Sequence, residues 1–171
     1  MFTMQTILKR QLILLKKLKE DLGMEIIVVI GGPLDKGAIR RWLNQKLQQK
    51  DSQEFQFIGV DGGCLKLMEE ELPIDLAIGD FDSISLEDKE ILKNYASKMI
   101  EFPSEKDFTD FEEALMWIAK SYPRKKVHVL GAFGGRVDHA ISCLWTMFRP
   151  ELQSLIPFFS LEDEWNHISF L

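Results

Sequence analysis

Two aspartates, Asp80 and Asp82, stand two residues apart in Gly79-Asp80-Phe81-Asp82-Ser83, directly after a short apolar run. On an extended segment, residues i and i+2 point the same way, so both carboxylates are expected to face one site. Like charges about 4 Å apart repel by roughly 4 kcal/mol at an effective dielectric of 20. Such crowding favours a compensating cation, and Mg²⁺ takes oxygen ligands and is typically shared with substrate phosphates.

Three further aspartates extend this acidic set. Asp61 follows another apolar run, and Asp107 and Asp110 stand at i and i+3 around a helix start. Any one aspartate has an alternative explanation as a turn former or a helix cap. The whole set at strand ends favours a divalent cation that carries a nucleotide polyphosphate.

A glycine-rich stretch, residues 131–139, follows a further strand-like run. A turn of this kind exposes backbone N–H groups, and the next helix start offers its positive dipole end to an anion. Arg136 can grip a phosphate with two hydrogen bonds, and Asp138 adds a carboxylate nearby. The alternative is that Arg136 and Asp138 form a surface ion pair at a helix start.

Gly31 and Gly32 come directly after a β-branched run, where glycine lets a ligand approach the backbone closely. The spacing of residues 32–37 resembles a P-loop, but Ala38 and Ile39 replace the Lys and Ser/Thr that a Walker A site needs. Lys106 precedes Asp107 and can contact phosphate, or it can be a solvated lysine.

Strand-like and helix-like segments alternate along the chain, which predicts a Rossmann-like α/β fold: an open, mainly parallel sheet with helices on both faces. Ligands of such sheets bind outside the carboxyl ends of the strands, where the polar segments above would converge. The expected strands are 25–30, 55–60, 75–78, 98–102 and 126–130, with strand-like segments at 155–161 and 167–171, and the expected helices are 6–22, 37–48, 64–70, 86 onward, 110–121 and 137–148.

Length and composition narrow the class of protein. A chain of 171 residues suits one main domain, and the net charge of −6 argues against a nucleic-acid surface. No apolar run approaches the roughly 20 residues that a membrane span needs, and no secretory pattern is present. Cys64 and Cys143 are too few for a disulfide framework, so we expect reduced cysteines in a cytoplasmic protein.

Four motifs occur in order along the chain: DGG at 61–63, GDFDS at 79–83, KDFTD at 106–110 and LGAFGGRVDH at 130–139. In this order and approximate spacing they resemble the thiamine pyrophosphokinase (thiamine diphosphokinase) family. The resemblance extends from about residue 26 to residue 148, and four motifs in register are far more specific than any one of them.

The resemblance implies transfer of a pyrophosphoryl group from ATP to the hydroxyl of thiamine, which yields thiamine diphosphate and AMP. It also implies Mg²⁺ and a homodimer. Residues 1–150 would form the α/β catalytic domain that binds ATP and Mg²⁺. Residues 151–171 would be only the start of a smaller C-terminal β-sandwich, most of which this sequence lacks.

The resemblance also assigns roles to residues, by motif position. Asp80, Asp82 and Asp110 would be the metal ligands, with Asp61 in the same acidic cluster. Asp107 and Thr109 would neighbour the nucleotide or the metal. Arg136 and Asp138 would reach the phosphates and the thiamine side.

The expected chemistry is mostly positioning and charge neutralisation, with the thiamine hydroxyl attacking the β-phosphorus of ATP in line. Either Asp61 or Asp138 would accept the hydroxyl proton. Two other functions stay open from the sequence. One is a Mg²⁺-dependent phosphohydrolase, since GDFDS alone resembles an acidic phosphatase loop. The other is a truncated module that binds nucleotide without turnover.

Overall fold

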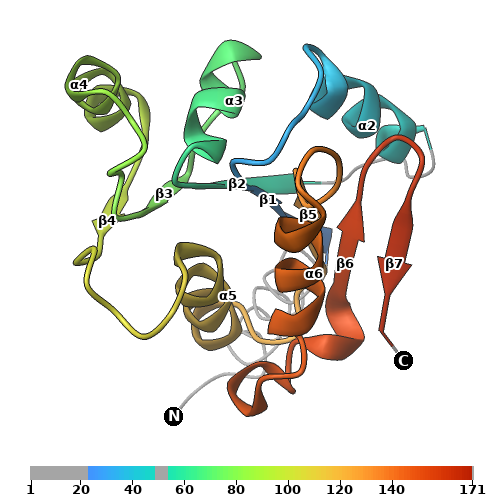
Figure 1. The fold of residues 1–171 in the computed structure, drawn as a ribbon. Coiled ribbons are helices and arrows are strands. Elements are labelled where there is room, and N and C mark those ends of the chain that lie inside the picture. The colour runs from blue at the N-terminus through green and yellow to red at the C-terminus, as the bar shows by residue number, and fades with distance from the viewer. Residues whose placement is uncertain (1–22, 49–53, 171) are drawn as a thin grey trace, which may run out of the picture.

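A single mixed sheet forms the centre of the molecule in the computed structural model, which describes residues 23–48 and 54–170 (Figure 1). Its strand order is β4-β3-β2-β1-β5-β6-β7. The strands are β1 (Met24–Val29), β2 (Glu54–Val60), β3 (Leu76–Gly79), β4 (Met99–Glu101), β5 (Val127–Leu130), β6 (Phe159–Glu162) and β7 (His167–Ser169). The helices are α2 (Ala38–Leu47), α3 (Gly63–Glu69), α4 (Leu86–Tyr95), α5 (Asp110–Ser121) and α6 (Val137–Thr146), with 3₁₀ turns η1 (Pro150–Leu152) and η2 (Ile156–Phe158).

The predicted parallel sheet is confirmed for β1 through β6, and only β7 runs antiparallel to its neighbour. β1 lies between β2 and β5, so both of its edges are paired, and helices pack on both of its faces. Its residues Ile26, Ile27, Val28 and Val29 are fully buried. A strand buried on both faces reads as a continuous apolar run, which explains why this one is visible in the sequence.

Helices cover both faces of the sheet, as the sequence predicts (Figure 1). Ile27 and Val29 of β1 belong to the core formed with α2, α3 and α4. Ile26 and Val28 point the other way, into the core formed with α5 and α6. The alternation of side chains along a strand thus divides the interior into two layers.

Two of the helix starts, those of α4 and α5, are fixed by capping side chains. Ser85 Oγ accepts a hydrogen bond from the Asp88 N–H and caps α4. At α5, Thr109 Oγ1 accepts from the Glu112 N–H, and the Glu112 carboxylate accepts from the Thr109 N–H. Of these two caps, only the one at α5 is a reciprocal capping box.

The last part of the chain departs from the predicted strands. Residues 156–158 form a 3₁₀ turn, so the strand expected over 155–161 begins only at Phe159. Pro157 contributes no backbone N–H to a ladder, which agrees with its exclusion from β6. β6 and β7 extend the sheet of the α/β domain. That residues 151–171 lead into a further β domain stays a prediction.

Three other expectations meet the structure as follows. The helix predicted for residues 6–22 lies outside the described residues. Cys64 and Cys143 are buried and free, as expected. None of the helices within the described ranges is long and apolar enough to cross a bilayer.

Candidate active site

The strand order brings four loops to one edge of the sheet. The chain proceeds from β1 outward through β2, β3 and β4, and then places β5 and β6 on the opposite side of β1. The loops after β3, β2, β1 and β5 therefore follow one another along the carboxyl edge. The order reverses between β1 and β5, and such a switch point is where ligands bind in open α/β sheets.

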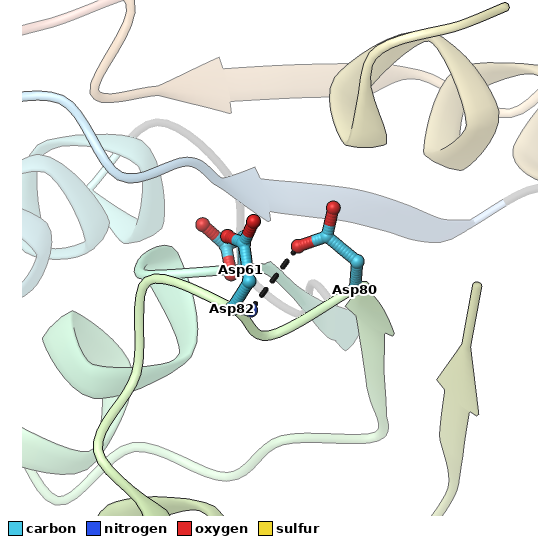
Figure 2. Close-up of side chains that lie close together, drawn as sticks. All are labelled: Asp61, Asp80 and Asp82. Atoms are coloured by element: carbon cyan, nitrogen blue, oxygen red, sulfur yellow. Dashed lines mark hydrogen bonds between the residues drawn. The ribbon is translucent and has the colours of Figure 1, made fainter. Parts of the chain in front are cut away.

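Three carboxylates gather at the β2 and β3 end of this edge. Asp61 follows β2, and Asp80 and Asp82 follow β3 (Figure 2). One carboxylate oxygen from each lies within 4.8 Å of the other two. Within the described residues this is the one group of three potential metal ligands that meets this distance.

The loop that carries Asp80 and Asp82 is a turn, so the extended geometry predicted for it is wrong. Phe81 has a left-handed backbone, with φ of 57°, and its side chain is buried. The Asp82 N–H donates to Asp80 Oδ1 at 3.2 Å. Asp61 also has a left-handed backbone, with φ of 46°. Non-glycine residues held in this region are strained, and such strain concentrates at functional sites.

The electrostatics of the group fit a divalent cation. The nearby Asp80 carboxylate raises the pKa of Asp82 above its ordinary value. Asp61 Oδ2 accepts a hydrogen bond from Ser83 Oγ at 2.6 Å, but Oδ1 is buried and accepts none from the described part of the chain. A buried carboxylate oxygen without a donor is costly, and a Mg²⁺ ligand bond would satisfy it.

Lys106 connects Asp110 to this group. Its Nζ lies 2.7 Å from Asp110 Oδ1 and 3.5 Å from Asp80 Oδ2, with only 11% of the side chain exposed. Burial alone lowers the pKa of the ammonium, but the two carboxylates outweigh it and raise the pKa. Asp110 is therefore near the three carboxylates, but a lysine occupies one of its oxygens. Its assignment as a metal ligand stays a prediction.

Asp107 and Thr109, the other two candidate site residues of the KDFTD motif at 106–110, have different surroundings. Asp107 is exposed. Thr109 caps α5: its hydroxyl accepts a hydrogen bond from the Glu112 N–H and donates one to the Glu112 carboxylate. Contacts of Asp107 and Thr109 with nucleotide or metal stay predictions.

A cleft of about 580 Å³ opens at the switch point between β1 and β5. This volume lies within the usual range of small-ligand sites. Its lining comes from the loop after β1 and from the start of α6: Gly31, Gly32, Pro33, Gly134, Gly135, Arg136, Asp138, His139 and Ser142. Gly31 and Gly32, which the sequence predicted to lie close to a ligand, therefore line this cleft.

Two of these glycines are required by close packing between the loops. A Cβ on Gly32 would lie 1.8 Å from the carbonyl oxygen of Gly131. Gly135 has φ of 69°, and a Cβ there would lie 2.8 Å from Pro33 Cγ. The bare backbones allow the two loops to meet at the cleft.

Arg136 and Asp138 form the ion pair that the sequence raised as an alternative. Arg136 Nε lies 3.0 Å from Asp138 Oδ1, and the side chains are 81% and 65% exposed. Hydrogen bonding to the guanidinium lowers the pKa of Asp138 to about 2. Because exposed ion pairs contribute little to stability, the guanidinium can exchange its partner for a phosphate at little cost. Phosphate binding by Arg136 stays a prediction.

Two residues with notable polar contacts had no role assigned from the sequence: Ser83 beside the aspartates and His128 in the sheet. Ser83 had no assigned role, although a hydroxyl one residue from an aspartate pair is a signal for a supporting donor. His128 was likewise given no functional role, but its imidazole lies between two buried carboxylates, those of Glu25 and Glu162. A histidine inside an apolar strand of a parallel sheet needs polar partners, and that need was the available signal.

Comparison with known proteins agrees with this geometry. Residues 47–158 match the family described as thiamin pyrophosphokinase, catalytic domain. The chain is 29% identical over 144 residues to thiamine pyrophosphokinase of Bacillus subtilis, covering 84% of this chain and 62% of that protein.

Solved structures show the same relationship. A thiamin pyrophosphokinase family protein from Enterococcus faecalis superimposes with a TM-score of 0.68 at 33% identity, covering 85% of this chain and 64% of that one. Thiamine pyrophosphokinase from Bacillus subtilis gives 0.63 at 28% identity, covering 85% and 63%. The chain thus spans less than two thirds of the length of these relatives. With its matched region containing the aspartates and the glycine-rich loop, the chain belongs to the thiamin pyrophosphokinase family, and residues 47–158 correspond to the catalytic domain.

Proposed function

We propose that this protein is a thiamine pyrophosphokinase, which transfers the terminal pyrophosphoryl group of ATP to the hydroxyl of thiamine. The products are thiamine diphosphate and AMP. The observation that carries the proposal is the group of Asp61, Asp80 and Asp82, with its unsatisfied buried oxygen, beside a cleft at the switch point. Family membership supplies the reaction.

In this proposal Asp61, Asp80 and Asp82 hold Mg²⁺, which would neutralise charge on the phosphates when bound. Lys106 keeps Asp110 and Asp80 close and adds positive charge at the edge of the group. The loops around Gly31, Gly32 and Gly134 provide the backbone surface along which ATP lies, as the cleft supports.

Arg136 and Asp138 act together at the start of α6. When the guanidinium turns to the phosphates, Asp138 is left as an exposed carboxylate. The thiamine hydroxyl attacks the β-phosphorus, the bond from that phosphorus to the α-phosphate oxygen breaks, and AMP leaves. Asp138 takes the hydroxyl proton, because Asp61 Oδ2 already accepts a hydrogen bond from Ser83 and its buried Oδ1, which has no donor among the described residues, would bind the cation.

The decisive experiment is to incubate the protein with ATP, Mg²⁺ and thiamine and to quantify AMP and thiamine diphosphate together. Equal amounts of both products, absent when thiamine or Mg²⁺ is omitted, are expected. Asp82→Asn should abolish this turnover, and Glu69→Gln, at an exposed residue of α3, should not. Inorganic phosphate without AMP would indicate a phosphohydrolase, and ATP binding with neither product would indicate a binding module.

The assembly and location proposed here are a homodimer in the cytoplasm. One face of α6 and the turn after it exposes the apolar side chains of Val137, Ile141, Trp145 and Phe148. An exposed apolar stripe of this kind supports an interface. The free buried cysteines agree with a reducing compartment. Sedimentation of the wild type and of Trp145→Glu would test the dimer, since the variant should sediment as a monomer.

A further inference from the structure

A buried cluster of charges lies across β1, β5 and β6, on the face of the sheet that α2 covers. His128 of β5 is at its centre, with 7% of its surface exposed. Its Nε2 lies 2.8 Å from Glu25 Oε2, and its Nδ1 lies 2.7 Å from Glu162 Oε1. The imidazole therefore bridges two carboxylates on strands at either side of its own.

Glu162, the last residue of β6, collects hydrogen bonds from three further residues. Trp42 Nε1 and Lys46 Nζ, both from α2, lie 2.9 Å and 2.8 Å from its Oε2. Ser160 Oγ lies 2.6 Å from its Oε1. This one carboxylate, only 3% exposed at the residue level, thus ties α2, β5 and β6 together.

The geometry requires a charged imidazole. Each ring nitrogen faces a carboxylate oxygen, so each must carry a proton to donate. Burial by itself lowers the pKa of His128, but the hydrogen bonds to Glu162 and Glu25 outweigh it and raise the pKa. A neutral ring would direct one lone pair at a carboxylate. If Nδ1 lost its proton, the Ser160 hydroxyl could donate a hydrogen bond to it, since Ser160 Oγ also lies 3.1 Å from His128 Nδ1.

The cluster lies next to the β6–β7 turn and α2, which together are called the wall beside the active-site cleft. β6 ends at Glu162, and the turn to β7 follows at residues 163–166. Trp165 of this turn and Trp42 of α2 line a cavity of about 210 Å³ with the loops after β1 and β5. Pro33 and Gly134 line both this cavity and the cleft at the switch point.

We propose that His128, in its charged form, is a positioning residue that holds the β6–β7 turn and α2 in place beside the cleft. Loss of its proton releases this wall, so substrate binding weakens as pH rises although no member of the cluster touches substrate. On deprotonation the Ser160 hydroxyl turns to His128 Nδ1, and Glu162 loses two donors at once. The effect on substrate rests on the proposed function, whereas the effect on the wall does not.

The sign follows from the groups that face His128. Glu25 of β1 and Glu162 of β6 favour its charged form, while Lys46 of α2 opposes it. Lys126 lies 3.8 Å from Glu25 Oε1, and the exposed His167 of β7 lies 3.3 Å from Glu162 Oε1. Because the folded pKa is raised, the stabilisation is complete below the ordinary pKa of 6.5 and is lost as pH rises through the folded value.

Hydrogen–deuterium exchange between pH 6 and pH 9, corrected for intrinsic rates, tests the inference without any substrate. In the wild type, exchange over residues 159–169 and 38–47 should increase several-fold with pH, whereas residues 54–79 should not respond. His128→Gln should exchange rapidly at every pH. His167→Gln is the matched control, because it removes an exposed imidazole beside the same carboxylate and should respond as the wild type does.

Ser160→Ala provides a second test that keeps the charged residues. It removes the donor that serves the neutral ring, so the midpoint of the exchange profile should move to higher pH. In turnover assays, KM for ATP or thiamine should rise several-fold with pH while kcat changes little, and His128→Gln should lack this rise.

A wild-type exchange profile that is flat with pH, or a Ser160→Ala midpoint that does not rise, would overturn the inference. A KM independent of pH for both substrates, despite a changing exchange profile, would overturn the link to the site. Absence of turnover at every pH would count against the proposed function instead, and the exchange profile would still decide whether His128 holds the wall.

Discussion

Neutralising Asp61 should reverse the order of stability between wild type and variant when Mg²⁺ is added. In Asp61→Asn the Ser83 hydroxyl keeps an oxygen acceptor, so the change removes one charge with little change of shape. Without metal, the wild type suffers repulsion between the partly buried carboxylates of Asp61 and Asp80. The variant does not.

The magnitude follows from the distance. One oxygen of Asp61 lies within 4.8 Å of one oxygen of Asp80, and at 4.8 Å two unit charges repel by about 0.9 kcal/mol in bulk water and about 3.5 kcal/mol at an effective dielectric of 20. We therefore expect Asp61→Asn to be more stable than the wild type by about 1–3 kcal/mol in EDTA. For a chain of this size, each kcal/mol raises the Tm by roughly 2–4 °C.

Mg²⁺ should stabilise only the wild type. An ion at about 100 times its dissociation constant adds about 2.7 kcal/mol to the free energy of unfolding. Thermal unfolding in EDTA and over a Mg²⁺ titration measures both effects, and Glu69→Gln controls for the loss of one surface charge. If Asp61→Asn is the less stable protein in EDTA and shows an undiminished Mg²⁺ shift, these carboxylates do not crowd around a cation.

Three further changes test other parts of the site. Arg136→Gln should weaken Mg·ATP binding about 10–100-fold in calorimetric titrations, because hydrogen bonds to charged groups contribute about 1.5–3 kcal/mol; an unchanged affinity would exclude a phosphate contact. Gly32→Ala should lower the free energy of unfolding in urea by about 1–3 kcal/mol, since its Cβ would overlap a carbonyl oxygen; an unchanged unfolding curve would contradict this close packing. Burial raises the pKa of Glu112, but hydrogen bonds at the start of α5 lower it below its ordinary 4.5, so its contribution is present above that pH and is lost in acid. Glu112→Gln should accordingly cost about 0.5–2 kcal/mol at pH 7 and progressively less towards pH 3, and a constant difference across that range would contradict the assignment.

The sheet and its edge were predictable because the relevant signals are local. The run from Ile26 to Ile30 could satisfy its apolar side chains only between two layers of helices. Aspartates and glycines directly after such runs then had to meet at one edge. The convergence of Asp61 with Asp80 and Asp82 follows from topology alone.

The interactions that escaped prediction depend on packing between distant segments. His128 meets Glu25 and Glu162 because β1, β5 and β6 are neighbours, an order that the sequence of β6 does not reveal. The turn at Phe81 forms because its ring is buried in the core. A positive φ is unfavourable for a bulky residue such as Phe, so local sequence preferences do not predict this turn. Lys106 likewise reaches Asp80 only because β3 and the start of α5 lie close together.

The buried ring of Phe81 has a consequence for which ions the protein accepts. It anchors the loop between Asp80 and Asp82 in the interior, so the two oxygens have little freedom to move apart. Ca²⁺ takes six to eight oxygen ligands at about 2.3–2.6 Å, whereas Mg²⁺ takes an octahedron at about 2.0–2.1 Å in which several ligands are water and few are protein groups. Because this loop is held rigidly, the site should discriminate between ions by their radius. We expect Ca²⁺, the larger ion, to bind without supporting turnover.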